Sequence, residues 1–343
     1  MASTNKAFFV GIDLGTSRSA VSSANGERHV VDSYVGWPVD HIARKLLKKQ
    51  VLIGREAIDN RSMLDLRRPL EAGYLKEGSE KDEAAVRELL RYLISLSGIE
   101  DEDKKRPKIH AVVGVPARAL VGKQLHLRNA MKGILDSVMI VPEPFAVAYG
   151  LEELLHTMVI DIGAGTTDFC LMNGRYPSEE ERRTLTEAGD TVDQELARLV
   201  RERYPEVQFS IHMIREWKEK WGFVGEPEEA VIVTAPVGAM PAQFDITHEM
   251  RSACEILLPP LIDTMFDLLA HVEPDYQERV RHNIILAGGC SQIYGLRESL
   301  QHALSRVGGG QVRVVKDPIF AGADGGLAIA LDAADSDWET LAA

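Results

Sequence analysis

Two short stretches of the sequence place an aspartate directly before a turn of glycine and hydroxyl residues. They contain Asp13, Gly15, Thr16 and Ser17 in the first copy, and Asp161, Gly163, Gly165, Thr166 and Thr167 in the second. Glycines let backbone N–H groups approach an anion, and hydroxyls add further donors. A carboxylate at such a place can hold Mg²⁺ through its water shell. The pattern predicts two phosphate-binding turns, each with a metal-side carboxylate.

The surroundings of the two turns repeat as well. Each turn follows an apolar run (residues 8–10 and 158–160) and leads into an alternating run and then an Asn-Gly pair, at positions 25–26 and 173–174. Strand, turn, strand and tight turn form a β-hairpin module. A lone aspartate before glycine is usually only a turn former. Matched modules instead favour two domains that grip one polyphosphate from both sides.

A second pair of segments supports the duplication. One pair consists of two apolar segments that contain glycine, residues 112–116 and 286–290. The other consists of two segments with an acidic residue before proline, residues 143–145 and 317–319. These pairs lie 174 positions apart, against 148 for the turns, so the second half carries 26 more residues. Each half reads as three strands, an insertion, then strand, helix, strand and helix. The predicted fold class is a duplicated α/β fold.

The repeat also predicts domain limits. The first domain comprises residues 1–150 plus 322–343, with an insertion at about 32–106, and the second comprises residues 151–321, with an insertion at about 193–247. Apolar residues at helical spacing predict helices at 79–97, 193–204 and 211–221, and residues 229–237 favour a strand. Ser79 is the expected N-cap of the first helix.

Glu143 stands between two prolines. Because a following proline disfavours helical backbone, Glu143 is expected on a strand-to-helix turn rather than within a helix. A carboxylate there can orient a water for attack on a γ-phosphate. The alternative is an acidic residue that interacts with the dipole of a helix at 146–155.

Three further segments could line a nucleotide site. Gly288 and Gly289 follow an apolar strand and precede a helix expected from about Ser291, so their bare backbone would let a base or sugar approach. Gly189 opens another helix, where it either contacts phosphate or sugar or only caps the helix. Lys218 can lie along an adenine face, although helical periodicity alone makes it a solvated surface residue.

Composition excludes several classes of function. The chain has 343 residues, of which 45% are hydrophobic and 27% charged, as expected for a soluble globular protein. Its net charge of -13 argues against a nucleic-acid partner. Three cysteines without paired spacing predict neither disulfides nor zinc. Residues 1–6 are too short and polar for a signal peptide, and prolines and aspartates interrupt the apolar stretch 256–272. The expectation is a cytosolic protein without direct membrane insertion.

Five segments in this order resemble the actin superfamily. They are residues 12–21, 141–150, 159–171, 284–296 and 317–330, and together they span nearly the whole chain. The resemblance implies an actin-like (ribonuclease H-like) duplicated fold, with two lobes and a nucleotide cleft between them. The size is similar to that of bacterial actins. Five short motifs resemble those of the magnetosome-organising bacterial actins in particular. They are residues 15–17, 114–119, 143–145, 161–168 and 316–318.

The resemblance also implies roles for individual residues. Asp13 and Asp161 would organise Mg²⁺, and Gly15, Thr16 and Ser17 would hold the β-phosphate side. The γ-phosphate side would be closed by Gly163, Gly165, Thr166 and Thr167. Glu143 would position the attacking water. The remaining contacts would be Gly189 at a phosphate, Lys218 at the adenosine, and Gly288 and Gly289 in the nucleotide pocket. Two positions depart from the family pattern, Cys290 in place of a third glycine and Arg215 in place of a glutamate near the ribose.

The implied function is an ATPase that binds Mg-ATP, hydrolyses it to ADP, and polymerises head to tail into cytoskeletal filaments. Such a filament would position magnetosome vesicles in a chain through a separate adaptor, and hydrolysis would set its lifetime. Two alternatives stay open. One is a small-molecule kinase of the same superfamily, and the other is a scaffold that binds nucleotide without turnover.

Overall fold

The computed structural model describes residues 7–71, 74–75, 80–99, 107–118 and 121–341. The chain forms two compact units. The first comprises Met1–Leu154 with Asp317–Ala343, and the second comprises Leu155–Lys316. The domain limits expected from the sequence, at 150/151 and 321/322, remain a prediction.

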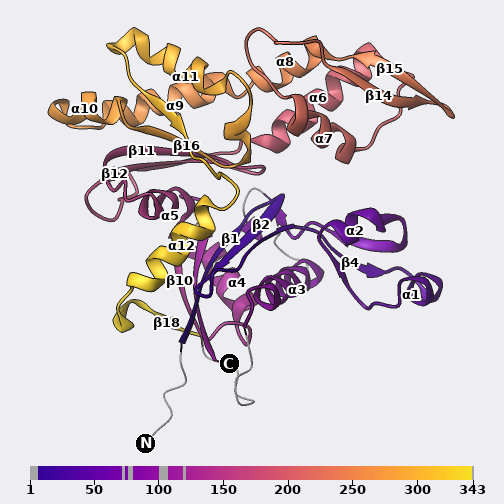
Figure 1. Cartoon of the computed structure of the whole chain (residues 1–343), viewed down its shortest axis with the longest axis horizontal. Coiled ribbons are helices and arrows are strands. Elements are labelled where there is room, and N and C mark those ends of the chain that lie inside the picture. Colours follow the sequence, from indigo (N-terminus) through magenta and orange to yellow (C-terminus); the bar gives the residue numbers. More distant parts are fainter. Residues whose placement is uncertain (1–6, 72–73, 76–79, 100–106, 119–120, 342–343) are drawn as a thin grey trace, which may run out of the picture. The chain divides into compact units, whose positions relative to one another are not determined.

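The first unit is built on a mixed sheet of six strands (Figure 1), in the order β18-β10-β9-β1-β2-β3. Its strands are β1 (Ala7–Leu14), β2 (Arg18–Ser23), β3 (Arg28–Asp32), β9 (Lys108–Val115), β10 (Ser137–Pro142) and β18 (Glu339–Thr340). The hairpin strands β1, β2 and β3 are antiparallel, whereas β9 pairs in parallel with both β1 and β10. The first glycine turn joins β1 to β2.

The second unit repeats this arrangement with five strands, in the order β13-β12-β11-β16-β17. They are β11 (Leu155–Ile162), β12 (Thr167–Asn173), β13 (Arg182–Leu185), β16 (Ile284–Ala287) and β17 (Val312–Val314). Here too the hairpin strands are antiparallel and the later strands are parallel to the first. Gly26 (φ 91°) and Gly174 (φ 76°) occupy the predicted Asn-Gly turns with the positive φ that favours glycine. The two halves thus share one strand order, as the repeat predicts.

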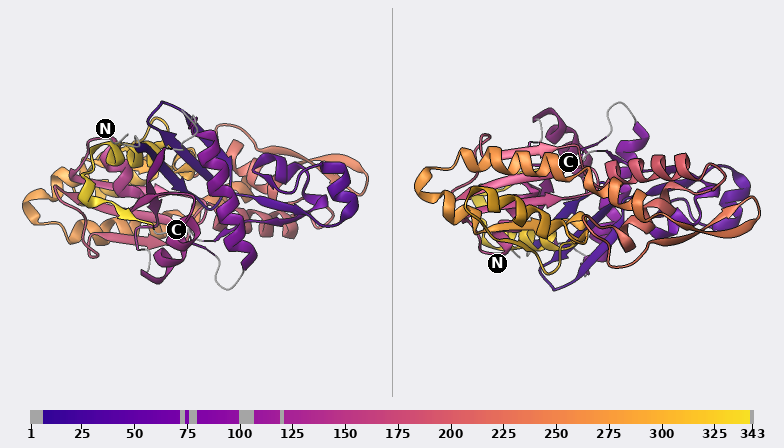
Figure 2. Two further views of the ribbon diagram at one scale, coloured as in Figure 1. Left: turned by 90° about the horizontal axis from the view of Figure 1, so that it is seen from below. Right: turned by 90° about the horizontal axis from the view of Figure 1, so that it is seen from above.

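Helices and small strands complete each unit. The first unit adds β4 (Val35–Pro38), α1 (His41–Leu47), β5 (Leu52–Ile53), α2 (Arg55–Asp59), β6 (Leu64–Arg67), β7 (Leu70–Glu71), β8 (Tyr74–Leu75), α3 (Glu80–Leu96), α4 (Val121–Met131), α5 (Glu143–Gly150) and α12 (Ala321–Asp332). The second adds α6 (Gly189–Arg203), α7 (Ile211–Trp221), β14 (Ile232–Val237), β15 (Met240–Asp245), α8 (Thr247–Glu255), α9 (Leu258–Ala270), α10 (Pro274–Arg281) and α11 (Leu296–Leu304). Figure 2 shows α9 and α11 side by side over the second sheet.

Most predicted elements are found, with shifted ends. The helix expected at 193–204 begins earlier, at Gly189, and the strand expected from residue 229 begins at Ile232. The helix expected near Ser291 is wrong, because Gly288 and Gly295 both have positive φ and confine that segment to a short 3₁₀ helix, Gly289–Gln292. The regular helix α11 starts only at Leu296. Ser79, the predicted N-cap of α3, lies outside the described residues.

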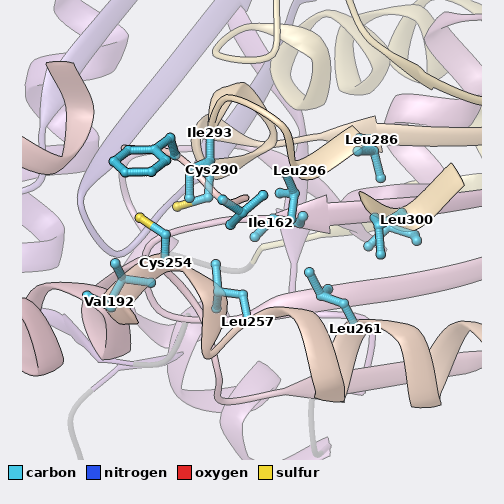
Figure 3. Packing of buried hydrophobic residues seen from close by; sticks show 14 of the residues in the cluster. Ile162, Val192, Cys254, Leu257, Leu261, Leu286, Cys290, Ile293, Leu296 and Leu300 are labelled. Carbon is cyan, nitrogen blue, oxygen red and sulfur yellow. The ribbon is translucent and has the colours of Figure 1, made fainter. Parts of the chain in front are cut away.

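Each unit has its own hydrophobic core. In the first, Leu89, Leu90 and Leu93 of α3 are fully buried against the sheet. In the second, side chains from the sheet, α9 and α11 interlock in one cluster, of which Figure 3 shows Ile162, Leu257, Leu261, Leu286, Leu296 and Leu300. Cores of this kind hold the strand ends, and therefore the glycine turns, in fixed positions.

The helix α12 lies unusually close to β1 and α5 (Figure 1). A methyl group on Gly11 would lie 2.0 Å from the carbonyl oxygen of Ala323, and one on Gly325 would lie 1.8 Å from that of Ala146. Both distances are too short for real contacts, and both clashes are with backbone. Only glycine therefore permits this packing.

Gly11→Ala is expected to lower the free energy of unfolding by about 1–3 kcal/mol, because α12 must move away from β1. Chemical denaturation measures the change. Gly289→Ala is the matched control, since a methyl group there meets no described atom within 4 Å. Equal stability of the two variants would contradict the prediction.

Candidate functional site

In the first unit, the predicted residues gather at the carboxyl ends of the parallel strands. Asp13 of β1 is in register with Gly114 of β9, and a methyl group on Gly114 would lie 3.0 Å from Cγ of Glu143. This strand end thus brings Asp13, the first glycine turn and Glu143 together. Ligands of open α/β sheets bind at such ends.

Glu143 is the first residue of α5, and Pro142 precedes it as N-cap. The sequence placed Glu143 before the helix because Pro144 follows it, and in this respect the expectation is wrong. A proline in the first helical turn is tolerated, since its missing N–H has no partner within the helix anyway. The carboxylate still stands at the junction of strand and helix.

Two residues that sequence reasoning missed hold the first glycine turn. The buried hydroxyl of Ser33 donates to the carbonyl oxygen of Gly15 at 2.7 Å and lies 2.9 Å from the hydroxyl of Ser19. Nε of Arg68 donates to the carbonyl oxygen of Thr16 at 2.8 Å. No spacing in the sequence links these residues to the turn. The only local signal is the serine at position 19, inside a strand that is otherwise largely buried.

Asp13 carries a half-buried carboxylate. Burial raises its pKa from 3.8 to about 6, and no cation among the described residues pairs with it. Its Oδ2 rests against bare backbone, because a methyl group on Gly322 would lie 2.8 Å away. A divalent cation would supply the missing positive charge, so the carboxylate fits Mg²⁺.

Within the described part of the chain, no group of three His, Cys, Asp or Glu side chains lies close enough to hold a metal by itself. Mg²⁺ commonly takes one or two carboxylates and completes its shell with substrate phosphates and water. A site built around Asp13 in the first unit, or Asp161 in the second, would follow that pattern.

In the second unit, the glycine turn is closed by its own backbone and tied to the start of α6. The N–H of Gly163 donates to the carbonyl oxygen of Thr166 at 2.9 Å. Gly189 N–H donates to the carbonyl oxygen of Gly163 at 3.1 Å, and Asp190 N–H donates to that of Ala164 at 2.7 Å. Gly189 therefore begins α6 and fixes the turn at the same time.

Thr167 has a structural role, because its hydroxyl is bonded within the fold. Its side chain is fully buried, and its hydroxyl donates to the carbonyl oxygen of Glu187 at 2.7 Å. The predicted phosphate contact of Thr167 stays a prediction, and a contact through this hydroxyl would require that bond to break. Thr166 is also mostly buried.

The strand β16 leads to Gly288 beside Asp161. A methyl group on Gly288 would lie 2.4 Å from Oδ1 of Asp161, and Gly288 has φ 75°. Glycine is thus required here twice, for its backbone angle and for the close carboxylate. A methyl group on Gly289 would meet no described atom within 4 Å, so this position leaves room for a ligand.

The side chain of Cys290 turns inward, into the hydrophobic cluster (Figure 3). Its Sγ lies 3.4 Å from the carbonyl oxygen of Gly163, behind the glycine turn. Burial raises the pKa of the thiol, which therefore stays neutral. Cys290 thus supports the turn from within.

Lys218 is buried rather than solvated. Its ammonium lies 2.6 Å from Oδ1 of Asp193 and donates to the carbonyl oxygen of Gly189 at 2.7 Å. Helical periodicity alone placed this residue on the surface, which is wrong because α7 packs against α6 at this point. The adenosine contact of Lys218 stays a prediction.

The two matching sheets, each with an Asp-Gly-Thr turn at its strand ends, define an actin-like protein. The MreB/Mbl protein family model matches residues 7–337, and the chain belongs to this family. It is 39% identical to the actin-like protein MamK of Paramagnetospirillum magneticum (strain AMB-1), over 97% of this chain and 95% of that protein. It is also 39% identical to MamK of Magnetospirillum gryphiswaldense (strain MSR-1), over 96% of this chain and 91% of that protein.

Solved structures agree with this assignment. A MamK double helical filament, 38% identical, matches with a TM-score of 0.92 over 96% of this chain and 100% of that chain. A non-polymerising MamK mutant bound to AMPPNP, also 38% identical, matches with a TM-score of 0.72 over the same shares. The predicted actin-like fold and the resemblance to magnetosome-type bacterial actins are confirmed. In the described residues, no helix is long and apolar enough to cross a membrane.

Proposed function

We propose that this chain is an actin-like ATPase that binds ATP and ADP with Mg²⁺ and polymerises into filaments. The observation that carries the proposal is the repeated Asp-Gly-Thr turn at matching strand ends of two equivalent sheets. The MamK structures support it further, since one relative is bound to a nucleotide analogue and another forms a filament.

Each predicted site residue has its own role in this proposal. Backbone N–H groups and hydroxyls of the first turn bind the β-phosphate side, and those of the second turn bind the γ-phosphate side. Asp13 and Asp161 hold the hydrated metal, which when bound neutralises phosphate charge. Glu143 orients a water for in-line attack and accepts its proton. The remaining contacts come from Gly189, Gly288 and Gly289.

The partner in assembly is a second copy of the same chain. Head-to-tail contacts are heterologous and do not close, so they give open filaments. Loss of the γ-phosphate would shift the chain toward a state with weaker contacts. We further propose that the filament lies in the cytoplasm beside a magnetosome chain and reaches vesicles through an adaptor, with no nucleic acid and no direct membrane insertion.

Electron microscopy of the purified chain with and without Mg-ATP, together with phosphate release, tests the proposal. Filaments that form with Mg-ATP and release phosphate are expected. A chain that stays monodisperse at high concentration in both conditions would refute polymerisation. Specific phosphoryl transfer to a small-molecule acceptor, without polymer, would instead identify a kinase, and filaments without phosphate release would identify a scaffold.

A further inference from the structure

The second unit contains three charged side chains with little or no exposure, on α6 and α7. The Asp193 side chain is 2% exposed, that of Lys218 is 7% exposed and that of Arg215 is 13% exposed. Lys218 Nζ lies 2.6 Å from Oδ1 of Asp193, and Arg215 Nε lies 3.2 Å from Oδ2. Buried charges are costly unless they are paired. These three side chains therefore tie α7 to the first turns of α6.

The network continues into the second glycine turn. Lys218 Nζ donates to the carbonyl oxygen of Gly189, and the N–H of Gly189 in turn donates to that of Gly163. Arg215 Nη2 lies 3.3 Å from Oδ1 of Asp190. The N–H of Asp190 is bonded to the turn as well, at Ala164. A continuous set of bonds thus joins α7 to the turn predicted to face the γ-phosphate.

Gly189, where α6 meets the second glycine turn, is tightly packed. A methyl group there would lie 2.8 Å from Cys290 Sγ, 3.1 Å from Lys218 Nζ and 3.2 Å from the Cα of Ala164. Close-packed groups transmit displacement, because no void absorbs it. Movement of the Lys218 ammonium must therefore move Gly189, the turn or both.

Lys218 keeps its charge in this setting. Burial alone would lower its pKa, but the negative neighbourhood that includes the Asp193 carboxylate more than offsets it, and the pKa is raised. The ammonium lies beside the Asp193 carboxylate and donates to the carbonyl oxygen of Gly189. With 7% of its surface exposed, it has little area left for a base.

We propose that Lys218, Asp193 and Arg215 are positioning residues that hold the second glycine turn in the conformation that favours ATP over ADP. The inference rests on the proposed function and deepens it, because it replaces the adenosine contact implied for Lys218 by control of the γ-phosphate turn. Through the same network, the nucleotide bound at the turn would affect α7.

The test compares nucleotide affinities of the wild type and Lys218→Met, in Mg²⁺ and below the concentration at which assembly begins. We expect the ratio of ATP to ADP affinity to fall about fivefold or more, within the usual range of coupling between sites. The ratio of ATP to GTP affinity should stay unchanged. Equal weakening of ATP and ADP, or an altered ATP to GTP ratio, would overturn the proposal in favour of an adenosine contact.

Arg203→Met is the control, because it breaks another ion pair at the far end of α6, where Nη1 of the exposed Arg203 lies 2.9 Å from Oε2 of the buried Glu249. It should lower stability and leave both affinity ratios unchanged. An equal fall of the ATP to ADP ratio in this variant would attribute the effect to general destabilisation and overturn the proposal.

Lys218→Met leaves Asp193 with Arg215 alone and could prevent folding. The double variant Lys218→Met/Asp193→Leu removes this pair of charges and leaves Arg215 beside Asp190. It is expected to fold, since a buried pair replaced by apolar residues is often tolerated. It should show the same fall in the ATP to ADP ratio, and an unchanged ratio would overturn the inference. Equal affinities of the wild type for ATP and ADP would also overturn the inference. A wild type that binds neither nucleotide would refute the proposed function itself.

Discussion

Glu143→Ala is expected to slow phosphate release about 100-fold or more, because general-base assistance contributes at least that much when a carboxylate is well placed. Glu143 stands at the start of α5, beside Gly114 and at the strand end that also carries Asp13. If Glu143 orients the attacking water as proposed, it acts on the chemical step and is not needed to bind the nucleotide. ATP affinity should change little, and filaments formed with Mg-ATP should persist longer than those of the wild type.

Single-turnover phosphate release and a nucleotide-binding titration separate the two effects. Glu88→Ala is the control: Glu88 lies on α3, where it pairs with Arg91 at 2.6 Å, and this variant should release phosphate at the wild-type rate. If Glu143→Ala releases phosphate as fast as the wild type, Glu143 has no part in the mechanism. Loss of nucleotide binding in this variant would show instead that the carboxylate supports the site.

Asp13→Asn is expected to stabilise the nucleotide-free protein and to weaken its use of Mg²⁺. The folded pKa of Asp13 is raised from 3.8 to about 6, so the folded state holds this proton more tightly than the unfolded state. The free energy of unfolding of the wild type therefore falls as pH rises between these values and stays lower above them. Because Asp13 is partly exposed, we expect this cost to be about 2 kcal/mol rather than the full shift.

Chemical denaturation without nucleotide, from about pH 4.5 to pH 8, measures the effect. Asp13→Asn should flatten this part of the profile and be the more stable form at the upper end. Its Mg²⁺ affinity in the presence of ATP should fall about tenfold or more, as for groups that act on a metal through water. Asp59→Asn, an exposed i,i+4 partner of Arg55, should change neither quantity. A less stable Asp13→Asn with normal Mg²⁺ dependence would refute both expectations.

Several groups at the candidate site were predictable because their signal is local. Asp13 and Asp161 each precede a glycine turn, and the turn needs small residues wherever it occurs. Gly26 and Gly174 mark the hairpin ends through their backbone angles alone. The spacing of the repeat also predicted the strand ends at Gly114 and Gly288, since the two halves of a duplicated chain fold in the same way.

Groups whose role depends on distant neighbours were not predictable in this way. Lys218 was placed on the surface by helical periodicity, yet it is buried against Asp193 because α7 packs on α6. Ser33 and Arg68 hold the first turn from positions that no spacing connects to it.

The sequence by itself determined the duplicated α/β fold, the two phosphate-type turns and the carboxylates beside them. Each depends on backbone preferences and on periods of a few residues. Only the tertiary structure decided that Asp13 is a half-buried carboxylate with a raised pKa, and that Gly11 must leave room for the backbone of α12. It also decided that buried charges on α6 and α7 reach the second turn. Burial and charge pairing are set by segments that meet only after folding, so no local pattern encodes them.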